Sequence, residues 1–333
     1  MPHQLDIKLS HYLNAITPHF LGKSTITRWM EKAKTNYCSV TTVFGFSWLI
    51  EGPLSKNQFV NLCEPNVSKL ILSLRDKLGF HTFIDVGSNR GWYSLLVSHG
   101  SNTRSIAFEP NLQTRELLRK NVEANDLQDK VSVFSFALSD TIGPQNFYQS
   151  NFKDNDGMAS LSSPLAQSNK SQVDVITLDS FWLEYVKSHF SPESEPIILI
   201  KLDIEGGEFR ALQGAKRLIN EIRPFILCEI NSTFLEYASQ IDGTTLIKFL
   251  VDLDYDVLYI SETRGLEFVT SAHDLPHELT FGKEHGGNYL FIPRTSTFDS
   301  QFWLRTPLTY FAFKTLVMNR VKNLFDQIFR NRN

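Results

Sequence analysis

The sequence predicts an α/β fold built on a doubly wound, mostly parallel sheet. Segments of strand character alternate with segments of helix character over most of the chain, which is typical of such sheets. Residues 197–203, Ile-Ile-Leu-Ile-Lys-Leu-Asp, form the most apolar run and indicate a strand covered by helices on both faces. Residues 85–91, Asp-Val-Gly-Ser-Asn-Arg-Gly, place a glycine turn between a strand and a helix. Because ligands bind beyond the carboxyl ends of parallel strands, we expect the site at those ends.

Composition sets the class of protein and the partners to expect. A chain of 333 residues can bury a large core, and its 42% hydrophobic content excludes a disordered or collagen-like chain. The net charge of −3 gives no general attraction to nucleic acid, and we expect no nucleic-acid partner. The three cysteines lack metal-binding spacing and favour a reducing compartment. With no signal-peptide segment and no membrane-length apolar run, we expect a soluble, cytoplasmic protein.

The elements before the first polar segment follow from periodicity and from turn residues. Aromatic and β-branched residues at 38–48 predict a short strand or hairpin, which Gly52 and Pro53 end. Pro65 near its start and apolar residues at helical spacing predict a helix over residues 65–78. The pattern then predicts strands at 83–86, 105–108 and 131–138, with helices at 92–97 and 112–124 between them.

The remaining elements are predicted in the same way. Residues 146–172 are rich in Asn, Asp, Gly and Ser, which favours a loop or a small hairpin. Beyond it the pattern predicts strands at 173–178, 197–203, 225–230, 256–260 and 288–292, and helices at 179–186, 208–219 and 244–253.

The glycine turn and the strand after it suggest which ligand is bound. Glu109 ends the next strand, about twenty residues past the turn, where nucleotide-binding folds place an acid on the ribose hydroxyls. The turn lacks the Gly-x-Gly-x-x-Gly pattern of a pyrophosphate site. Asp85 would repel a phosphate but suits an ammonium or sulfonium group. These features favour S-adenosylmethionine, with NAD as the second candidate.

A second acidic block supplies the candidates for acid–base chemistry. Asp203 interrupts an apolar strand at its carboxyl end, where an unpaired buried carboxylate would be costly. Glu208 fits the acidic start of a helix, and Lys201 is expected to pair structurally with one of these acids. Asp203, Glu205 and Glu229 are the candidate catalytic bases. Carboxylates could hold a divalent cation, but no spacing requires one, and we expect no metal.

Five ordered motifs resemble one known family. They are Asp85-Val-Gly-Ser-Asn-Arg-Gly-Trp-Tyr-Ser, Phe108-Glu-Pro, Ala137-Leu-Ser-Asp, Ile200-Lys-Leu-Asp-Ile-Glu-Gly-Gly-Glu and Asn288-Tyr-Leu-Phe-Ile-Pro. Together they resemble the FkbM family of S-adenosylmethionine-dependent methyltransferases, over roughly residues 40–295. The resemblance implies the Rossmann-like class I methyltransferase fold, a doubly wound, mostly parallel sheet with an antiparallel last strand.

The resemblance also implies roles for individual residues. Glu109 would hold the ribose, Ala137 would border the adenine, and Asp203 would lie beside the sulfonium and the acceptor. The methionine part of the cofactor would be held by the turn residues Asp85, Gly87, Ser88, Asn89 and Gly91. Characterised family members methylate hydroxyl oxygens, so the expected reaction is O-methylation of a hydroxyl on a sugar, glycan or secondary metabolite.

Two other functions stay open at the level of sequence. One is an NAD-linked oxidoreductase, and the other is a non-catalytic cofactor-binding or scaffold protein of the same fold. The acceptor is expected to be a small molecule or a glycan, bound by the loops 146–172 and 261–287. Three histidines in the second of these loops are a further possible source of a catalytic base: His273, His277 and His285.

The ends of the chain lie outside the resemblance. We divide the chain into a helical extension (1–37), an FkbM-like methyltransferase domain (38–295) and a basic amphipathic helix (296–333). From residue 301 onward, six lysines and arginines face only Asp326, and apolar residues repeat at three- and four-residue intervals. This helix is expected to pack on the domain or on a second subunit, or to attach to an anionic membrane surface.

Overall fold

The computed structural model describes residues 37–42, 45–51, 64–150, 159–162, 168–189, 197–261, 265–268 and 287–294. The predicted helices before residue 37 and after residue 295, and the three histidines of the loop 261–287, lie outside these residues. Among the described residues, no helix combines the length and apolar character that crossing a membrane requires.

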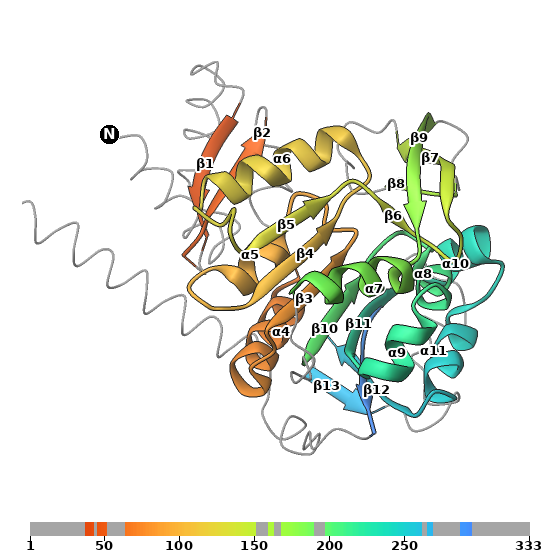
Figure 1. The fold of residues 1–333 in the computed structure, drawn as a ribbon. Helices are drawn as coiled ribbons and strands as arrows, with labels where there is room; N and C mark the ends of the chain where they lie inside the picture. Colours follow the sequence, from red (N-terminus) through yellow and green to blue (C-terminus); the bar gives the residue numbers. More distant parts are fainter. Residues whose placement is uncertain are drawn as a thin grey trace, which may run out of the picture.

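The main sheet has eight strands in the described part of the chain, in the order β13-β12-β14-β11-β10-β3-β4-β5 (Figure 1). Strands β5, β4, β3, β10 and β11 are parallel, whereas β14 is antiparallel to both β11 and β12. The predicted doubly wound, mostly parallel sheet with an antiparallel last strand is therefore confirmed. The strands span Thr82–Val86 (β3), Arg104–Phe108 (β4), Val131–Phe134 (β5), Ile198–Leu202 (β10), Phe225–Ile230 (β11), Tyr255–Ser261 (β12), Gly265–Phe268 (β13) and Gly287–Pro293 (β14).

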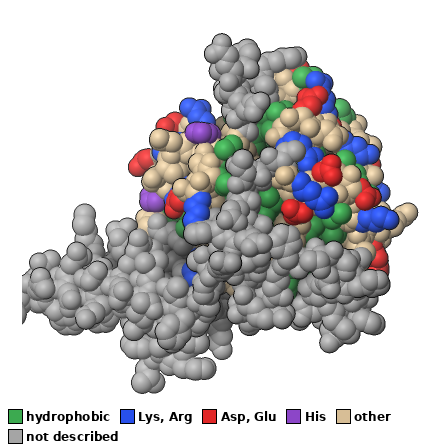
Figure 2. All heavy atoms as spheres, turned by 90° about the horizontal axis from the view of Figure 1, so that it is seen from below, with side chains coloured by type: hydrophobic (Ala, Val, Ile, Leu, Met, Phe, Trp, Pro, Cys, Tyr) green, Lys and Arg blue, Asp and Glu red, His purple; other side chains and the backbone are tan. Residues whose placement is uncertain are grey.

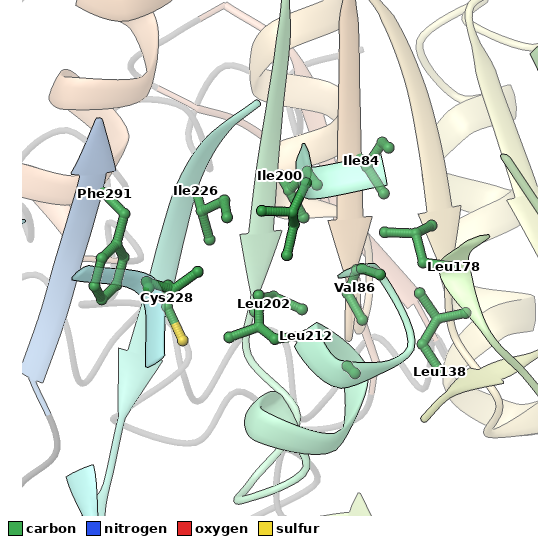
Figure 3. Close-up of a cluster of buried hydrophobic side chains, with 14 of the residues drawn as sticks. Ile84, Val86, Leu138, Leu178, Ile200, Leu202, Leu212, Ile226, Cys228 and Phe291 are labelled. Carbon is green, nitrogen blue, oxygen red and sulfur yellow. The ribbon is translucent and has the colours of Figure 1, made fainter. Parts of the chain in front are cut away.

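Helices cover both faces of this sheet. One apolar cluster joins the strands to α4 (Pro65–Leu78), α5 (Trp92–Ser98) and α6 (Leu112–Glu123). The other, part of which Figure 3 shows, includes residues of α7 (Leu178–His189), α8 (Glu208–Gln213), α9 (Lys216–Ile222), α10 (Ser232–Ser239) and α11 (Gly243–Val251). Because every residue of β3 and of β10 is buried, the apolar run at 197–203 is explained by cover on two faces.

The predicted hairpin before the domain core is confirmed as β1 (Tyr37–Thr41) paired antiparallel with β2 (Ser47–Glu51). The Asn125 side chain, just after α6, accepts a hydrogen bond from the Ser47 N–H (2.6 Å) and donates one to the Ser47 carbonyl (2.7 Å). Phe46 meets Trp92 edge to face, with ring centroids 5.2 Å apart. The hairpin is thereby fixed against α5 and the end of α6.

The prediction of one strand over residues 131–138 is wrong. Residues 131–134 form β5 at the edge of the main sheet, and Ala137–Leu138 form β6 in a second sheet. That sheet has the order β6-β9-β7-β8, with β7 (Gly143–Ser150), β8 (Ala159–Ser160) and β9 (Ser168–Ile176). A continuous apolar run does not reveal where the chain leaves one sheet for another.

The loop or small hairpin predicted at 146–172 is only partly right. β7 pairs antiparallel with β9 from Gly143 opposite Val175 to Ser150 opposite Ser168. The strands were missed because many of their residues are polar. Whether such residues form a strand depends on the neighbours they pack against, and these neighbours come from distant parts of the sequence.

Two predictions about helices also fail. The single helix predicted at 208–219 is α8 and α9, separated at Gly214 and Ala215. Asp179 of α7 causes the break: its N–H donates to the Gly214 carbonyl (2.9 Å), and its carboxylate accepts the N–H groups of Arg217 (3.0 Å) and Leu218 (2.8 Å). Helix α10 was not predicted; the Asn231 side chain caps it by accepting the N–H groups of Thr233 and Phe234.

Gly214 provides a test of this packing. A Cβ at Gly214 would lie 2.0 Å from the Ser139 carbonyl oxygen, and no rotamer change relieves a backbone overlap. We expect Gly214→Ala to lower the free energy of unfolding by about 3 kcal/mol. The matched control is Gly100→Ala, where φ is +65° and nothing lies within 4 Å, with an expected loss of about 1 kcal/mol. Urea unfolding measures both, and equal losses would contradict the contact.

Candidate functional site

A cavity of about 300 Å³ opens at the carboxyl ends of β3, β4, β10 and β11. Its lining brings together residues that lie far apart in the sequence. Of the predicted site residues, seven line it: Gly87, Asn89, Glu109, Ala137, Asp203, Glu205 and Glu229. The other three, Asp85, Ser88 and Gly91, are not among the lining residues and lie buried in the turn behind it.

The glycine turn is pressed against the end of β10. Gly87 has φ +80°, and a Cβ there would lie 2.0 Å from the Asp203 carbonyl oxygen, so only glycine allows this approach. The N–H groups of Gly87 and Ser88 donate to the Phe108 carbonyl at 3.1 and 3.0 Å. The Ser88 hydroxyl donates to the same oxygen at 3.2 Å. Ser88 therefore fixes the turn to β4 and presents no side chain to the cavity.

Asp85 holds the turn from behind. Its Oδ2 accepts hydrogen bonds from the N–H (3.1 Å) and the hydroxyl (2.6 Å) of Ser94 in α5. Its Oδ1 is buried and has no hydrogen-bond partner among the described residues. Burial raises the pKa of Asp85 to about 6, while the charge of Lys201 acts in the opposite direction. Asp85 thus links β3 to α5. It does not line the cavity, so it can act on a ligand there only through its electrostatic field.

Glu109 joins the turn to the end of β4. Its Oε2 accepts the Asn89 N–H (2.9 Å), and its Oε1 accepts the Asn111 N–H (2.8 Å). Burial raises the pKa of Glu109 to about 7, against the two backbone hydrogen bonds that lower it. Each carboxylate oxygen has a second lone pair, so Glu109 can still accept hydrogen bonds from a diol in the cavity.

The buried Lys201 forms an ion pair with the half-buried Asp203 at the end of β10. The Lys201 side chain is 2% exposed, and its Nζ lies 2.7 Å from Asp203 Oδ2. The same ammonium lies 4.6 Å from the centroid of the Tyr93 ring. Burial alone would raise the pKa of Asp203, but Lys201 and a hydrogen bond with Glu229 hold it below its ordinary value. The predicted structural pairing of Lys201 is confirmed.

The three acids around this pair differ in state. The charge of Asp203, then burial, raises the pKa of Glu229 far above its ordinary value, so Glu229 is protonated and donates to Asp203. Burial, then the charges of Asp203 and Glu208, raises the pKa of Glu205 to about 8. Glu208 Oε1 accepts the N–H groups of Ile204 (2.9 Å) and Gly206 (3.2 Å), which confirms its predicted place at a helix start.

Several lining residues were not predicted from the sequence. Glu64 lies at the start of α4, and its carboxylate accepts hydrogen bonds from the Tyr93 hydroxyl (2.5 Å) and the Asn288 amide (2.6 Å). The second sheet adds another wall, which contains Gln145, Phe147, Ser160, Leu161 and Ser162. The Ser160 hydroxyl donates to the Glu205 carbonyl at 3.1 Å, and so ties this wall to the turn after β10. No periodicity or motif identifies such contacts between distant segments.

The lining favours a cationic organic ligand over a metal ion. Within the described ranges, no group of three or more His, Cys, Asp or Glu is placed to hold a metal ion. Five acids line the cavity: Glu64, Glu109, Asp203, Glu205 and Glu229. Asp203 and the buried Asp85 bring negative charge close to the glycine turn, which suits a sulfonium or ammonium group.

A match to a known family of sequences covers most of this site and identifies the family of the chain. Residues 85–257, a little over half of the chain, match the Methyltransferase FkbM domain, from the glycine turn to β12. The chain belongs to the FkbM methyltransferase family. This family uses S-adenosylmethionine as methyl donor, and the cavity of this FkbM methyltransferase has the donor set that such a cofactor needs.

Solved structures similar to this FkbM methyltransferase are themselves methyltransferases. Methyltransferase FkbM from Methylobacillus flagellatus KT is 16% identical, with a TM-score of 0.37, over 64% of this chain and 43% of that chain. The O-methyltransferase from Bacillus cereus, in complex with SAH, is 13% identical (TM-score 0.38) over 85% and 96%. TomG from Streptomyces achromogenes, in complex with SAM, is 10% identical (TM-score 0.37) over 68% and 79%. These scores are low, and the assignment rests on the sequence match.

This chain therefore spans less than half of the Methylobacillus methyltransferase. Among the curated proteins, none matches the chain.

Glu109 makes cofactor affinity depend on pH. Because burial raises its pKa to about 7, the carboxylate that we expect to accept the ribose hydroxyls forms as the pH rises through neutrality. We expect the affinity for S-adenosylhomocysteine to increase about tenfold between about pH 6 and about pH 8. Glu109→Gln should bind more weakly at the higher pH and lose this slope. Calorimetry at several pH values measures both, and an unchanged slope in Glu109→Gln would contradict the assignment.

Proposed function

We propose that this FkbM methyltransferase transfers a methyl group to a hydroxyl oxygen of a sugar, a glycan or a secondary metabolite. The observation that carries the proposal is the Asp203 carboxylate, which lines the cavity at the end of β10 and is fixed by Lys201 at 2.7 Å. A hydroxyl is a weak acid, and an acceptor that must lose its proton needs a positioned base of this kind.

The donor would be held by the predicted residues that line the cavity. Gly87 and Asn89 of the turn lie nearest the methionine part, Glu109 takes the ribose, and Ala137 borders the adenine. S-adenosylmethionine, when bound, supplies a methyl group on a positively charged sulfur. Asp203 offers this charge a carboxylate that Lys201 keeps ionised.

Of the three candidate bases, we assign the role to Asp203. Glu229 is protonated and serves as a hydrogen-bond donor to Asp203, so it positions the base. The pKa of Glu205 is raised to about 8, so Glu205 is largely protonated at neutral pH and is a poor proton acceptor. Asp203 is a weak base. A weak base is sufficient, because the hydroxyl becomes strongly acidic as its oxygen gains a methyl group.

The second sheet supports a hydroxyl-rich acceptor. Its wall combines the apolar side chains of Phe147 and Leu161 with the polar groups of Gln145, Ser160 and Ser162. Apolar surface covers the face of a sugar ring, and hydroxyl and amide groups bond its hydroxyls. The wall therefore supports a sugar or a sugar-like metabolite as acceptor.

We further propose a cytoplasmic protein that binds no nucleic acid. The net charge is −3, and the described surface in Figure 2 carries Lys and Arg interspersed with Asp and Glu. A membrane or subunit contact through residues 301–333 stays a proposal from the sequence.

The cofactor is tested by calorimetry with S-adenosylmethionine, S-adenosylhomocysteine and NAD. We expect binding of the first two and none of NAD, because the turn lacks a pyrophosphate pattern and acids line the cavity. Binding of NAD alone would favour the oxidoreductase. Binding of S-adenosylmethionine without turnover on any hydroxyl acceptor would favour the scaffold protein.

Two substitutions separate the base from the residue that positions it. Asp203→Asn should lower kcat about 100-fold or more, because it removes the proton acceptor. Glu229→Gln should stay within about tenfold of wild type, because its amide N–H replaces the carboxyl O–H that donates to Asp203. Mass spectrometry of methylated products from candidate hydroxyl acceptors gives the rates. Calorimetry with S-adenosylhomocysteine and thermal unfolding serve as controls, and equal losses from both variants would refute the assignment.

A further inference from the structure

Glu64 belongs to the cavity although it lies outside the family match. The match begins at residue 85, whereas Glu64 stands just before α4. Its carboxylate lines the cavity and is held from two sides, by the Tyr93 hydroxyl at Oε2 (2.5 Å) and by the Asn288 amide at Oε1 (2.6 Å). Tyr93 comes from α5, and Asn288 comes from β14, which the match also leaves out.

The conformation of Glu64 serves the cavity and not the helix. It occupies the N-cap position of α4, yet its side chain makes no capping hydrogen bond. Its φ of 39° and ψ of 78° are left-handed, which a residue other than glycine rarely adopts. Strain of this kind persists where surrounding contacts fix it, and here those contacts are the bonds to Tyr93 and Asn288.

The sheet order places Glu64 at one end of the cavity. Glu109 lies at the end of β4, on one side of β3. On the other side of β3, Asp203 directly follows β10, and Glu229 and Asn288 lie in β11 and β14. The glycine turn after β3 therefore lies between Glu109 and the groups around Glu64, and a ligand that meets both acids spans that turn.

The carboxylates near Glu64 outnumber the cations near them, which favours binding of a cationic group. Lys201, the buried cation at this end, interacts electrostatically with Asp203, Glu64 and Asp85. Three carboxylates thus share one ammonium in this part of the described structure. The resemblance links Asp85 to the methionine part of the cofactor, but Asp85 does not line the cavity. A direct contact with the ammonium group would therefore have to come from another carboxylate.

We propose that Glu64 binds the α-ammonium group at the methionine end of the donor, an inference that rests on the proposed use of S-adenosylmethionine. Tyr93 and Asn288 are positioning residues that hold the carboxylate toward the cavity. The site for the donor therefore has an acid at each end, Glu109 for the ribose and Glu64 for the ammonium.

The test compares two ligands that differ in the amino-acid end. S-adenosylhomocysteine carries the ammonium, whereas 5′-methylthioadenosine has the same adenine, ribose and thioether without it. In the full-length chain, Glu64→Gln should weaken S-adenosylhomocysteine about tenfold or more and change 5′-methylthioadenosine less than about twofold in calorimetry. Glu64→Asp, which keeps the charge but shortens its reach, should show the same selectivity. Glu116→Gln, on the exposed face of α6, is the matched control and should change neither affinity.

Each other outcome has a definite meaning. Equal weakening of both ligands by Glu64→Gln and Glu64→Asp, with a lower melting temperature, would make Glu64 a structural residue and overturn the inference. Unchanged affinity for S-adenosylhomocysteine with a raised KM for the acceptor would assign Glu64 to the acceptor instead. Failure of the wild-type chain to bind either ligand would overturn the proposed function itself, which separates that failure from an error about Glu64.

Discussion

The buried ion pair of Lys201 and Asp203 sets the conditions for the rest of the site. A lysine 2% exposed in the middle of the sheet costs several kcal/mol unless a charge and hydrogen bonds compensate it. Asp203 supplies the charge, and the Tyr93 ring covers the ammonium at 4.6 Å. Because Asp203 must stay ionised to compensate the charge of Lys201, the next acid, Glu229, keeps its proton and donates a hydrogen bond to Asp203. One buried cation thus fixes the protonation of two acids on neighbouring strands and leaves one of them as a base.

The same strand end also shapes the glycine turn. The Asp203 N–H donates to the Val86 carbonyl at 3.1 Å, and the Asp203 carbonyl fills the space that a side chain at Gly87 would need. The first and fourth motifs of the family pattern are therefore one unit, in which the position of the turn and that of Asp203 depend on each other. A change that displaces Asp203 displaces the cofactor loop with it, since no flexible side chain separates them.

Much of this could be predicted from the sequence, because the relevant signals are local. The strand ends at Asp85, Glu109 and Asp203 follow apolar runs, and the sheet order brings such ends together whatever the loops do. The misses share another cause. The break between α8 and α9 is made by Asp179 from a different helix, and the second sheet is made by polar strands that pair at long range. Glu64 precedes Pro65 like any helix start, and only the distant Tyr93 and Asn288 reveal what its carboxylate does.

The arrangement also orients the reaction. Strand β4, which Glu109 follows, lies on one side of β3, while β10, β11 and β14 lie on the other side with Lys201, Asp203 and Glu229 at or near their ends. In the proposed site, the turn and Asp203 would hold the sulfonium end of the donor, and Glu229 would fix the Asp203 carboxylate by a hydrogen bond. The second sheet reaches the same point from above, because Ser160 bonds the Glu205 carbonyl two residues after Asp203. In the proposed reaction, an acceptor held by that sheet would present its hydroxyl to Asp203, the proposed base, as in-line transfer requires.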